Sequence, residues 1–336
     1  MSTFVLAEAI RPTPLGNASI IDFASALPTG TRSAQDMAAD SGLDVDHIRR
    51  ITHCERIPVL AEGESVLSLC VRAAERLRDR HQARFAEIDR VVVAGAGHWD
   101  HPFWSPSAAL ARELGIHAAH CFEVANFCNS SATGLRLTLD AVGAGTSRLT
   151  LLVLADQLSR VVDTSDPEAR ELFNYGDAAT ALLVGSDRGR FEIVDTLSLT
   201  DPSWSGFYRG EHSPSGSVLL RNHEIREGLG DRYVEAFDQL VAGIFARNGM
   251  AAADVGLFLI NHGDRRMHEA LLSRLGIPAE RSWFRYDAMG HMGASDPFLA
   301  LDEATEAGGI RAGDAVLIAS SGLGFTWGVT LLRATG

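Results

Sequence analysis

The sequence contains no lysine, so all 30 of its basic side chains are arginines, and 43 aspartate and glutamate residues outnumber them. The resulting formal net charge of −13 argues against nucleic acid or an anionic membrane as the main partner, because either would need a compensating basic patch. No apolar run reaches the roughly eighteen residues of a membrane span, and the opening MSTFVLAEAIRPTP lacks the features of a secretory signal. We therefore expect a cytoplasmic protein.

Cysteine is also scarce, and its spacing excludes the common cysteine motifs. The four cysteines show no CxxC pair, so reduced thiols are expected rather than disulfides. The stretch GAGHWD, residues 95–100, lacks the third glycine of a dinucleotide fingerprint, and the chain's closely spaced histidines lack both helical i, i+4 spacing and a carboxylate partner. We expect no metal and no bound cofactor.

What the sequence does have is a regular alternation of apolar runs with helical segments or turns. The runs at 89–97, 120–127, 149–157 and 180–185 have the character of buried strands, and the pattern restarts after residue 190. This alternation predicts an α/β fold with a buried, largely parallel sheet.

Two halves with similar element order indicate an internal duplication, although no literal repeat is visible. We expect an N-terminal half, residues 1–188, and a C-terminal half, residues 189–336. The segment 201–228 is rich in Gly, Ser and Pro, and it is interpreted as an irregular excursion that either faces the substrate or forms a passive surface loop.

The stretch EVANFCNSSATGL, residues 123–135, places Cys128 after an apolar run and before small residues that open a helix. The partial positive charge of a helix N-terminus and a nearby imidazole both favour thiolate. A thiolate in this place could attack a thioester and form an acyl-enzyme.

Three further polar corners follow apolar strands: His262, His291 and the turn SSGLGF, residues 320–325. Strand ends are where ligands collect in α/β sheets, so these corners and Cys128 could converge. The histidines would act as base or donor, and the amides of Cys128 and Gly324 would hold the carbonyl oxygen. Taken singly, each residue is also compatible with a packing role.

Six segments together resemble the thiolase superfamily, specifically its β-ketoacyl-acyl-carrier-protein synthase III branch, over nearly the whole chain. In chain order these are EVANFCNSSATGL, LLVLADQLSRVVD, YGDAATALLVG, INHGDRRMHEALLSRLGIP, GHMGASDPFLALDEA and SSGLGFTWGVTLLR. The resemblance implies a duplicated five-layer α/β/α/β/α fold and a homodimer. It assigns Cys128 as nucleophile, His262 as catalytic base or donor and Gly324 as the oxyanion amide.

The resemblance also implies the substrate contacts. The segment HWDHPFWSPSAAL, residues 98–110, matches a region near the family's dimer interface that shapes the partner's acyl pocket. Trp104 and Ser105 are therefore expected to bind substrate, and the small Ser105 leaves room for a longer or bulkier acyl group. Phe325, in the C-terminal glycine turn, is expected to bind substrate as well. Arg265 and Arg266 could dock an acidic carrier protein or be simply solvated.

The sequence departs from the family at three places. His291 stands where the family has asparagine, and HGDR replaces an HQAN-like run and is one residue shorter. The tryptophan and arginine that hold coenzyme A adenine in the family are missing, since His47 and Ile51 fall at roughly those positions. This favours a carrier-bound acyl donor over coenzyme A.

We therefore predict a ketosynthase III-like acyltransferase of specialised polyketide or fatty-acyl metabolism. It would accept an acyl group on Cys128 from an acyl carrier protein or coenzyme A thioester and condense it with a malonyl-type thioester. Two alternatives stay open. Because imidazole can accept a proton, His291 could direct the acyl group to an alcohol or amine; otherwise the chain is a non-catalytic partner subunit of a ketosynthase heterodimer.

Overall fold

The computed structural model describes residues 18–214, 216–224 and 226–336. The N-terminal stretch on which the expectation of a missing signal rests lies outside these residues. Among the helices described, none is long and apolar enough to cross a membrane.

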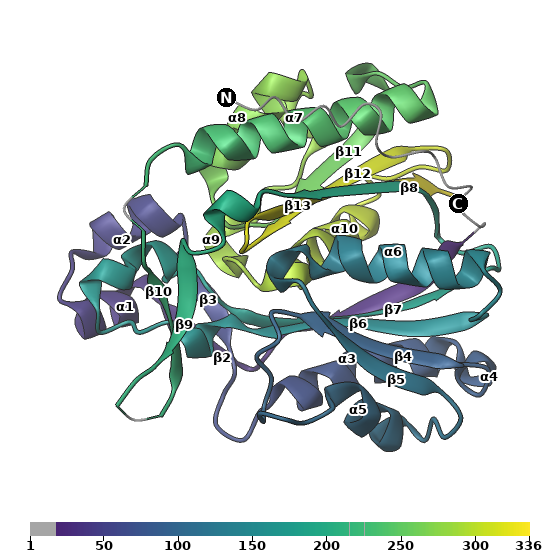
Figure 1. Cartoon of the computed structure of the whole chain (residues 1–336), viewed down its shortest axis with the longest axis horizontal. Coiled ribbons are helices and arrows are strands. Elements are labelled where there is room, and N and C mark those ends of the chain that lie inside the picture. The colour runs from purple at the N-terminus through teal and green to yellow at the C-terminus, as the bar shows by residue number, and fades with distance from the viewer. Residues whose placement is uncertain (1–17, 215, 225) are drawn as a thin grey trace.

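Nine strands form one large sheet that runs through the molecule (Figure 1). In spatial order the strands are β11 (Val255–Ile260), β12 (Ala315–Gly322), β13 (Thr326–Ala334), β8 (Phe191–Thr200), β1 (Ser19–Ala26), β7 (Asp177–Gly185), β6 (Leu149–Gln157), β4 (Arg90–Gly95) and β5 (His120–Ala125). Only two residue pairs join β1 to β8, so the sheet divides naturally at this seam.

The strand directions repeat on the two sides of the seam. On one side, β1 pairs antiparallel with β7, and β7 pairs antiparallel with β6, which in turn pairs parallel with β4. On the other side, β8 pairs antiparallel with β13, and β13 pairs antiparallel with β12, which in turn pairs parallel with β11. The expectation of a largely parallel sheet is wrong, because a strand with both faces covered is a continuous apolar run whichever way its neighbour points.

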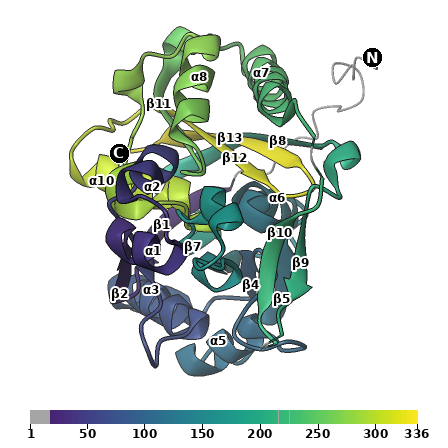
Figure 2. The same cartoon turned by 90° about the vertical axis from the view of Figure 1, so that its left-hand side faces the viewer.

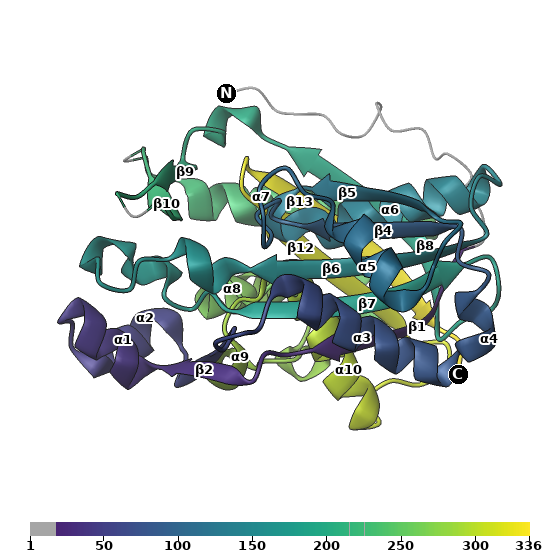
Figure 3. The ribbon, with the colours of Figure 1, turned by 90° about the horizontal axis from the view of Figure 1, so that it is seen from below.

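Helices cover the two halves of the sheet in alternating layers (Figure 1). The helices that pack on the sheet are α3 (Val66–Arg80), α5 (Pro106–Leu114), α6 (Ser130–Gly143), α7 (Leu229–Asn248), α8 (Arg265–Leu275) and α10 (Asp296–Glu306). Helices α6 and α10 lie between the two halves and share one core with both. Helices α3 and α5 cover the outer face of the N-terminal half, as Figure 3 shows from below, and α7 and α8 cover that of the C-terminal half. The result is the expected five-layer α/β/α/β/α arrangement.

The apolar spacing of α7 explains how one of these helices attaches. Phe237, Leu240, Val241 and Ile244 are buried at i, i+3, i+4 and i+7, so they form one stripe that packs on the outer face of β13 and β8. The connection between β7 and β8 contains residue 188. The division of the chain into two domains at that residue stays a prediction.

Smaller elements gather at one end of the layers (Figures 1 and 2). They comprise α1 (Ala34–Ser41), α2 (Val45–Thr52), β2 (Gly30–Ser33), β3 (Arg56–Val59), α9 (Tyr286–Met289) and a hairpin of β9 (Tyr208–His212) and β10 (Val218–Asn222), whereas α4 (Gln82–Phe85) extends α3 elsewhere. The segment 201–228 is therefore not wholly irregular, because this hairpin lies within it. Its Gly and Ser content concealed two short strands.

Candidate active site

Two pockets meet at Cys128, at the end of the layers where the smaller elements gather. The large pocket has a volume of about 420 Å³ and the small pocket about 190 Å³. Cys128, Tyr175 and Leu323 line both, so a group bound to the cysteine sulfur can extend into either one.

The backbone places Cys128 in a sharp turn between strand and helix. It lies in the 3₁₀ helix η1 (Phe127–Asn129), after β5 and directly before α6. Phe127 has a φ of 50°, which is unusual for a bulky residue and reverses the chain just before the cysteine. The Oγ of Ser130 fixes the turn, since it donates to the carbonyl of Gly95 at 2.8 Å. The N–H groups of a helix's first turn lack partners within the helix, so they are suited to binding negative charge beside the thiol.

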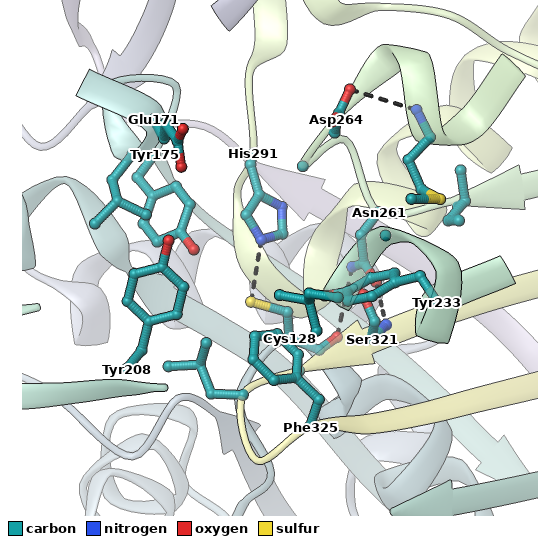
Figure 4. Close-up of a pocket in the computed structure, with 18 of the residues that line it drawn as sticks. Cys128, Glu171, Tyr175, Tyr208, Tyr233, Asn261, Asp264, His291, Ser321 and Phe325 are labelled. Carbon is teal, nitrogen blue, oxygen red and sulfur yellow. Dashed lines mark hydrogen bonds between the residues drawn. The ribbon is translucent and has the colours of Figure 1, made fainter. Parts of the chain in front are cut away.

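His291 is the imidazole that faces this thiol (Figure 4). Its Nε2 lies 3.1 Å from the Sγ of Cys128, and its Nδ1 lies 2.5 Å from Oδ2 of Asp296. The three side chains form a series from thiol to imidazole to carboxylate, the arrangement used to activate a nucleophile through a histidine of fixed orientation.

The buried groups of this series shift one another's pKa values. Burial raises the pKa of the Cys128 thiol, and the neighbouring His291 opposes that rise. Burial alone would lower the pKa of His291, but the charges of Cys128 and Asp296 outweigh it and raise this pKa well above its ordinary value. His291 can therefore take the thiol proton at neutral pH.

Asp296 is fixed by main-chain donors as well as by the imidazole. Its side chain is fully buried and accepts the backbone N–H of His262 at 2.8 Å and that of Met292 at 2.7 Å. Sequence reasoning missed Asp296, because an aspartate that opens a helix before a proline is a common capping pattern. Its distance of five residues from His291 was the only available signal.

His262, the predicted catalytic base or donor, lies outside both pockets. It is buried, and its ring packs edge-on against Tyr286 with centroids 4.8 Å apart. Neither ring nitrogen makes a well-formed hydrogen bond within the described residues, and burial lowers its pKa. Its catalytic role stays a prediction that this geometry does not favour.

Asn261, the preceding residue, lines the large pocket instead. Its Nδ2 donates to the carbonyl of Gly293 at 2.8 Å, and its Oδ1 accepts the N–H of Ser321 at 2.8 Å. Ile260 and Asn261 both line this pocket although they are consecutive, so the alternation of a strand does not decide which residue faces it. No pattern in the sequence distinguished Asn261 from His262 as the residue that lines the pocket.

The glycine turn between β12 and β13 packs against the turn that carries Cys128 and forms one wall of the large pocket. A Cβ on Gly322 would lie 2.9 Å from the carbonyl oxygen of Asn126 and 3.1 Å from the nitrogen of Asn129, so only glycine permits this approach. Leu323 and Phe325 line the large pocket, whereas Gly324 does not. The oxyanion role of Gly324 and the binding role of Phe325 stay predictions, and the amide of Leu323 is a second candidate for the oxyanion.

The other walls of the large pocket carry hydroxyl groups that the sequence did not reveal. Tyr175 and Tyr208 lie on one side of His291, and Tyr233 lies on the other side of Cys128 (Figure 4). Burial raises the pKa of Tyr208 to about 12, so its phenol is neutral and can donate a hydrogen bond. Glu171 is a further wall residue and brings one carboxylate near these phenols.

Trp104 and Ser105 do not line either pocket. Ser105 caps α5, because its Oγ accepts the N–H of Ala108 at 3.2 Å and donates to Oε1 of Glu123 at 2.7 Å. The ring of Trp104 packs edge-on against His101. Their predicted role depends on a partner subunit and stays a prediction.

The two arginines assigned to carrier docking differ in environment. Arg265 forms an ion pair with Glu269 at 2.9 Å, whereas Arg266 lines the large pocket. Ile51 also lines this pocket, and His47 does not. Among the described residues, no group of three or more histidine, cysteine, aspartate or glutamate side chains could hold a metal ion.

Comparison with solved structures supports the fold. The β-ketoacyl-acyl-carrier-protein synthase III of Thermus thermophilus superposes with a TM-score of 0.84 at 26% identity, over 94% of this chain and 99% of that one. The priming β-ketosynthase of the R1128 polyketide pathway superposes with a TM-score of 0.85 at 23% identity, over 97% and 99% of the two chains, which is a likeness of fold alone.

Sequence comparison identifies the family. Residues 122–202 match the family described as 3-oxoacyl-[acyl-carrier-protein] synthase III, and residues 245–334 match its C-terminal part. The β-ketoacyl-[acyl-carrier-protein] synthase III of Xylella fastidiosa is 29% identical over 318 residues, which cover 91% of this chain and 95% of the relative. The two family matches together span just over half of the chain, which therefore belongs to the 3-oxoacyl-[acyl-carrier-protein] synthase III family.

Proposed function

We propose that this protein is a ketosynthase III-like acyltransferase that carries the acyl group of a thioester on Cys128. The observation that carries the proposal is the 3.1 Å contact between Cys128 Sγ and His291 Nε2 at the junction of two pockets. A buried thiol beside an imidazole is suited to nucleophilic attack on a carbonyl, and the family relationship indicates a thioester as the substrate.

Acylation then proceeds in two steps. His291 accepts the thiol proton at Nε2 while Asp296 holds Nδ1, and the thiolate attacks the thioester carbonyl. The developing negative charge on the carbonyl oxygen would be bound by main-chain N–H groups, for which Cys128 and either Leu323 or Gly324 are the candidates. The carbon–sulfur bond of the donor breaks, and the departing thiolate takes a proton from His291.

Condensation with a malonyl-type thioester is the first candidate for the second half-reaction. The extender would enter the large pocket after the donor has left. Loss of carbon dioxide leaves an enolate, whose carbon attacks the acyl carbonyl and expels the Cys128 thiolate. His291 is the candidate for stabilising the enolate oxygen, because its Nε2 lies 3.1 Å from the Sγ that carries the acyl group.

Transfer to an alcohol or amine is the second candidate, and one observation favours it. Only one of the two predicted catalytic imidazoles, that of His291, lines the large pocket, and Asn261 provides an amide in place of the second. A single imidazole held by Asp296 is the arrangement of a general base, which would take a proton from the acceptor's hydroxyl or amino group.

The donor would be an acyl carrier protein or coenzyme A thioester. Arg266 lines the large pocket, where a guanidinium can meet the phosphate of either carrier. The enzyme would act in the cytoplasm as a homodimer, and specialised fatty-acyl or polyketide assembly is the setting that fits its departures from the family. A silent partner subunit is the remaining alternative, against which the assembled thiol, imidazole and carboxylate count.

Intact-protein mass spectrometry tests the proposal. Wild type, Cys128→Ala and the control Cys121→Ala are incubated with a panel of acyl thioesters. An acyl mass on wild type and on the Cys121 variant, but not on the Cys128 variant, is the expected result, and a panel without any adduct would contradict it. Release of labelled carbon dioxide from a malonyl thioester would then identify condensation, and its absence together with acylated alcohol or amine would identify transfer.

A further inference from the structure

Two carboxylates line the large pocket, and they differ in their surroundings. Asp264 caps α8, since its Oδ1 accepts the backbone N–H of Arg266 at 2.7 Å. Glu171 belongs to the 3₁₀ helix η3 (Pro167–Leu172), is exposed, and forms no hydrogen bond or ion pair within the described residues. The carboxylate of Glu171 is therefore available to a molecule that enters the pocket.

The arginines around Glu171 do not neutralise its charge. Arg170, its neighbour along the chain, donates to Oε1 of Glu168 at 3.4 Å. Arg266 belongs to the start of α8, and Figure 4 shows the capping residue Asp264 on the far side of the catalytic imidazole from Glu171. The side of the pocket that contains Glu171 is therefore negatively charged.

Two phenol hydroxyl groups lie on the same side of the pocket. Tyr175, Tyr208 and Glu171 are all placed to one side of His291 (Figure 4). Neither hydroxyl has a hydrogen-bond partner within the described residues, and neither is an enclosed atom, so both are open to the pocket. Burial raises the pKa of both phenols, so each is neutral and can accept a hydrogen bond from an N–H group.

We propose that this side of the large pocket binds an acyl acceptor that carries an ammonium group, which pairs with Glu171 and the two phenol oxygens. This inference rests on the proposed acylation of Cys128 and selects transfer as the second half-reaction. An ammonium forms a charge-assisted hydrogen bond with a carboxylate, whereas the free carboxylate of a malonyl-type extender would be repelled there. The pocket volume of about 420 Å³ admits a small molecule that has no carrier.

The transfer step uses only groups that are already in place. The ammonium end stays protonated beside Glu171, and the nucleophile at the other end is a hydroxyl or a second amine in its neutral form. The nucleophile loses its proton to Nε2 of His291 as its oxygen or nitrogen attacks the acyl carbonyl. The carbon–sulfur bond then breaks, and the Cys128 thiolate takes the proton from His291, which restores the thiol and releases an ester or amide.

The test measures how fast free acceptors remove the acyl group from preformed acyl-Cys128, by intact-protein mass spectrometry after excess thioester has been removed. Unbranched amino alcohols of increasing length are compared with the diol and the hydroxy acid of equal length. The diamine of equal length distinguishes a nitrogen from an oxygen nucleophile. At the best length we expect the amino alcohol or the diamine to react about fivefold or more faster than the diol, and the hydroxy acid to react slowest.

Substitution of Glu171 then assigns the preference to its charge. In Glu171→Gln the preference for the ammonium-bearing acceptor should fall to about twofold or less, because the side chain keeps its shape and loses its charge. Glu168→Gln is the control and should keep the preference, because Glu168 lies on the same 3₁₀ helix but does not line the pocket.

Three outcomes would overturn the inference while acylation of Cys128 still occurs. They are equal rates with the amino alcohol, the diamine and the diol in wild type, release of the acyl group by a malonyl thioester alone, and an unchanged preference in folded Glu171→Gln. If no thioester loads Cys128, the proposed function itself fails, and the inference fails with it.

Discussion

Cys128 and His291 lie 3.1 Å apart, Sγ to Nε2, although 163 residues separate them along the chain. The thiol comes from the turn before α6 in the N-terminal half, and the imidazole comes from the segment before α10 in the C-terminal half. Both helices lie in the central layer between the two parts of the sheet (Figure 1). The duplicated architecture thus brings one reactive group from each half to the same place.

This pairing predicts different outcomes for the two histidines that the sequence singled out. We expect His291→Leu to lower the rate of Cys128 acylation by about a hundredfold or more, because the thiol loses its proton acceptor. His262→Leu should change that rate by less than about tenfold, because its ring lies outside both pockets. Rates of acyl-enzyme formation by mass spectrometry decide between them. A greater loss in the His262 variant would restore the role that the sequence suggested.

Asp296 should act through His291 and not on the substrate. In Asp296→Asn the imidazolium loses a negative partner, so we expect the pKa of His291 to fall and thiolate formation at Cys128 to require higher pH. The pH profile of Cys128 alkylation by iodoacetamide should therefore shift upward, with acylation at neutral pH reduced by about a hundredfold. Asp302→Asn on the same helix is the control and should leave the profile in place. An unshifted profile in Asp296→Asn would mean that the carboxylate only supports the backbone.

Much of the architecture followed from the apolar runs, and the place of Cys128 directly before a helix followed from the small residues after it. The direction of the strands could not be predicted in this way. Burial on both faces produces the same continuous apolar run whether the neighbouring strands are parallel or antiparallel. That Asn261 lines the large pocket and His262 does not could not be predicted, because both residues follow the same strand directly. The pocket residue Tyr208 could not be recognised because it lies in a Gly- and Ser-rich segment, where its strand partner Asn222 follows fourteen residues later.

We expect Gly322 to be required for the correct position of the turn that carries Cys128. An added methyl group at residue 322 would press on the Asn126 carbonyl and the Asn129 nitrogen, which are backbone atoms that cannot rotate away. We expect Gly322→Ala to cost about 1–3 kcal/mol in the free energy of unfolding and to slow acylation at least tenfold. Gly263→Ala is the control, because a Cβ there meets nothing within 4 Å. Denaturant unfolding and acylation rates measure the two effects, and equal behaviour of the variants would contradict the close approach.

We expect Asp156 to make the stability of the protein depend on pH in the acidic range. Its carboxylate is buried and accepts hydrogen bonds from the N–H groups of Ala96 and Ala294. It therefore stabilises the segment that contains Gly293, whose carbonyl accepts a hydrogen bond from Asn261. Burial raises its pKa to about 6 from 3.8, so the folded state binds the proton more tightly than the unfolded state. Its contribution to stability is therefore greatest below about pH 4 and is lost as the pH rises through about 6, by at most about 3 kcal/mol.

Asp156→Asn isolates this contribution, because asparagine does not titrate. Relative to the variant, the wild type should lose unfolding free energy between pH 4 and pH 6, in the window set by the two pKa values, and the difference should then stay constant up to about pH 8. Urea unfolding of both proteins at each pH measures it. A difference that grows in the wild type's favour as the pH rises would show instead that the backbone donors Ala96 and Ala294 outweigh burial and lower this pKa, as hydrogen bonds to a carboxylate otherwise do.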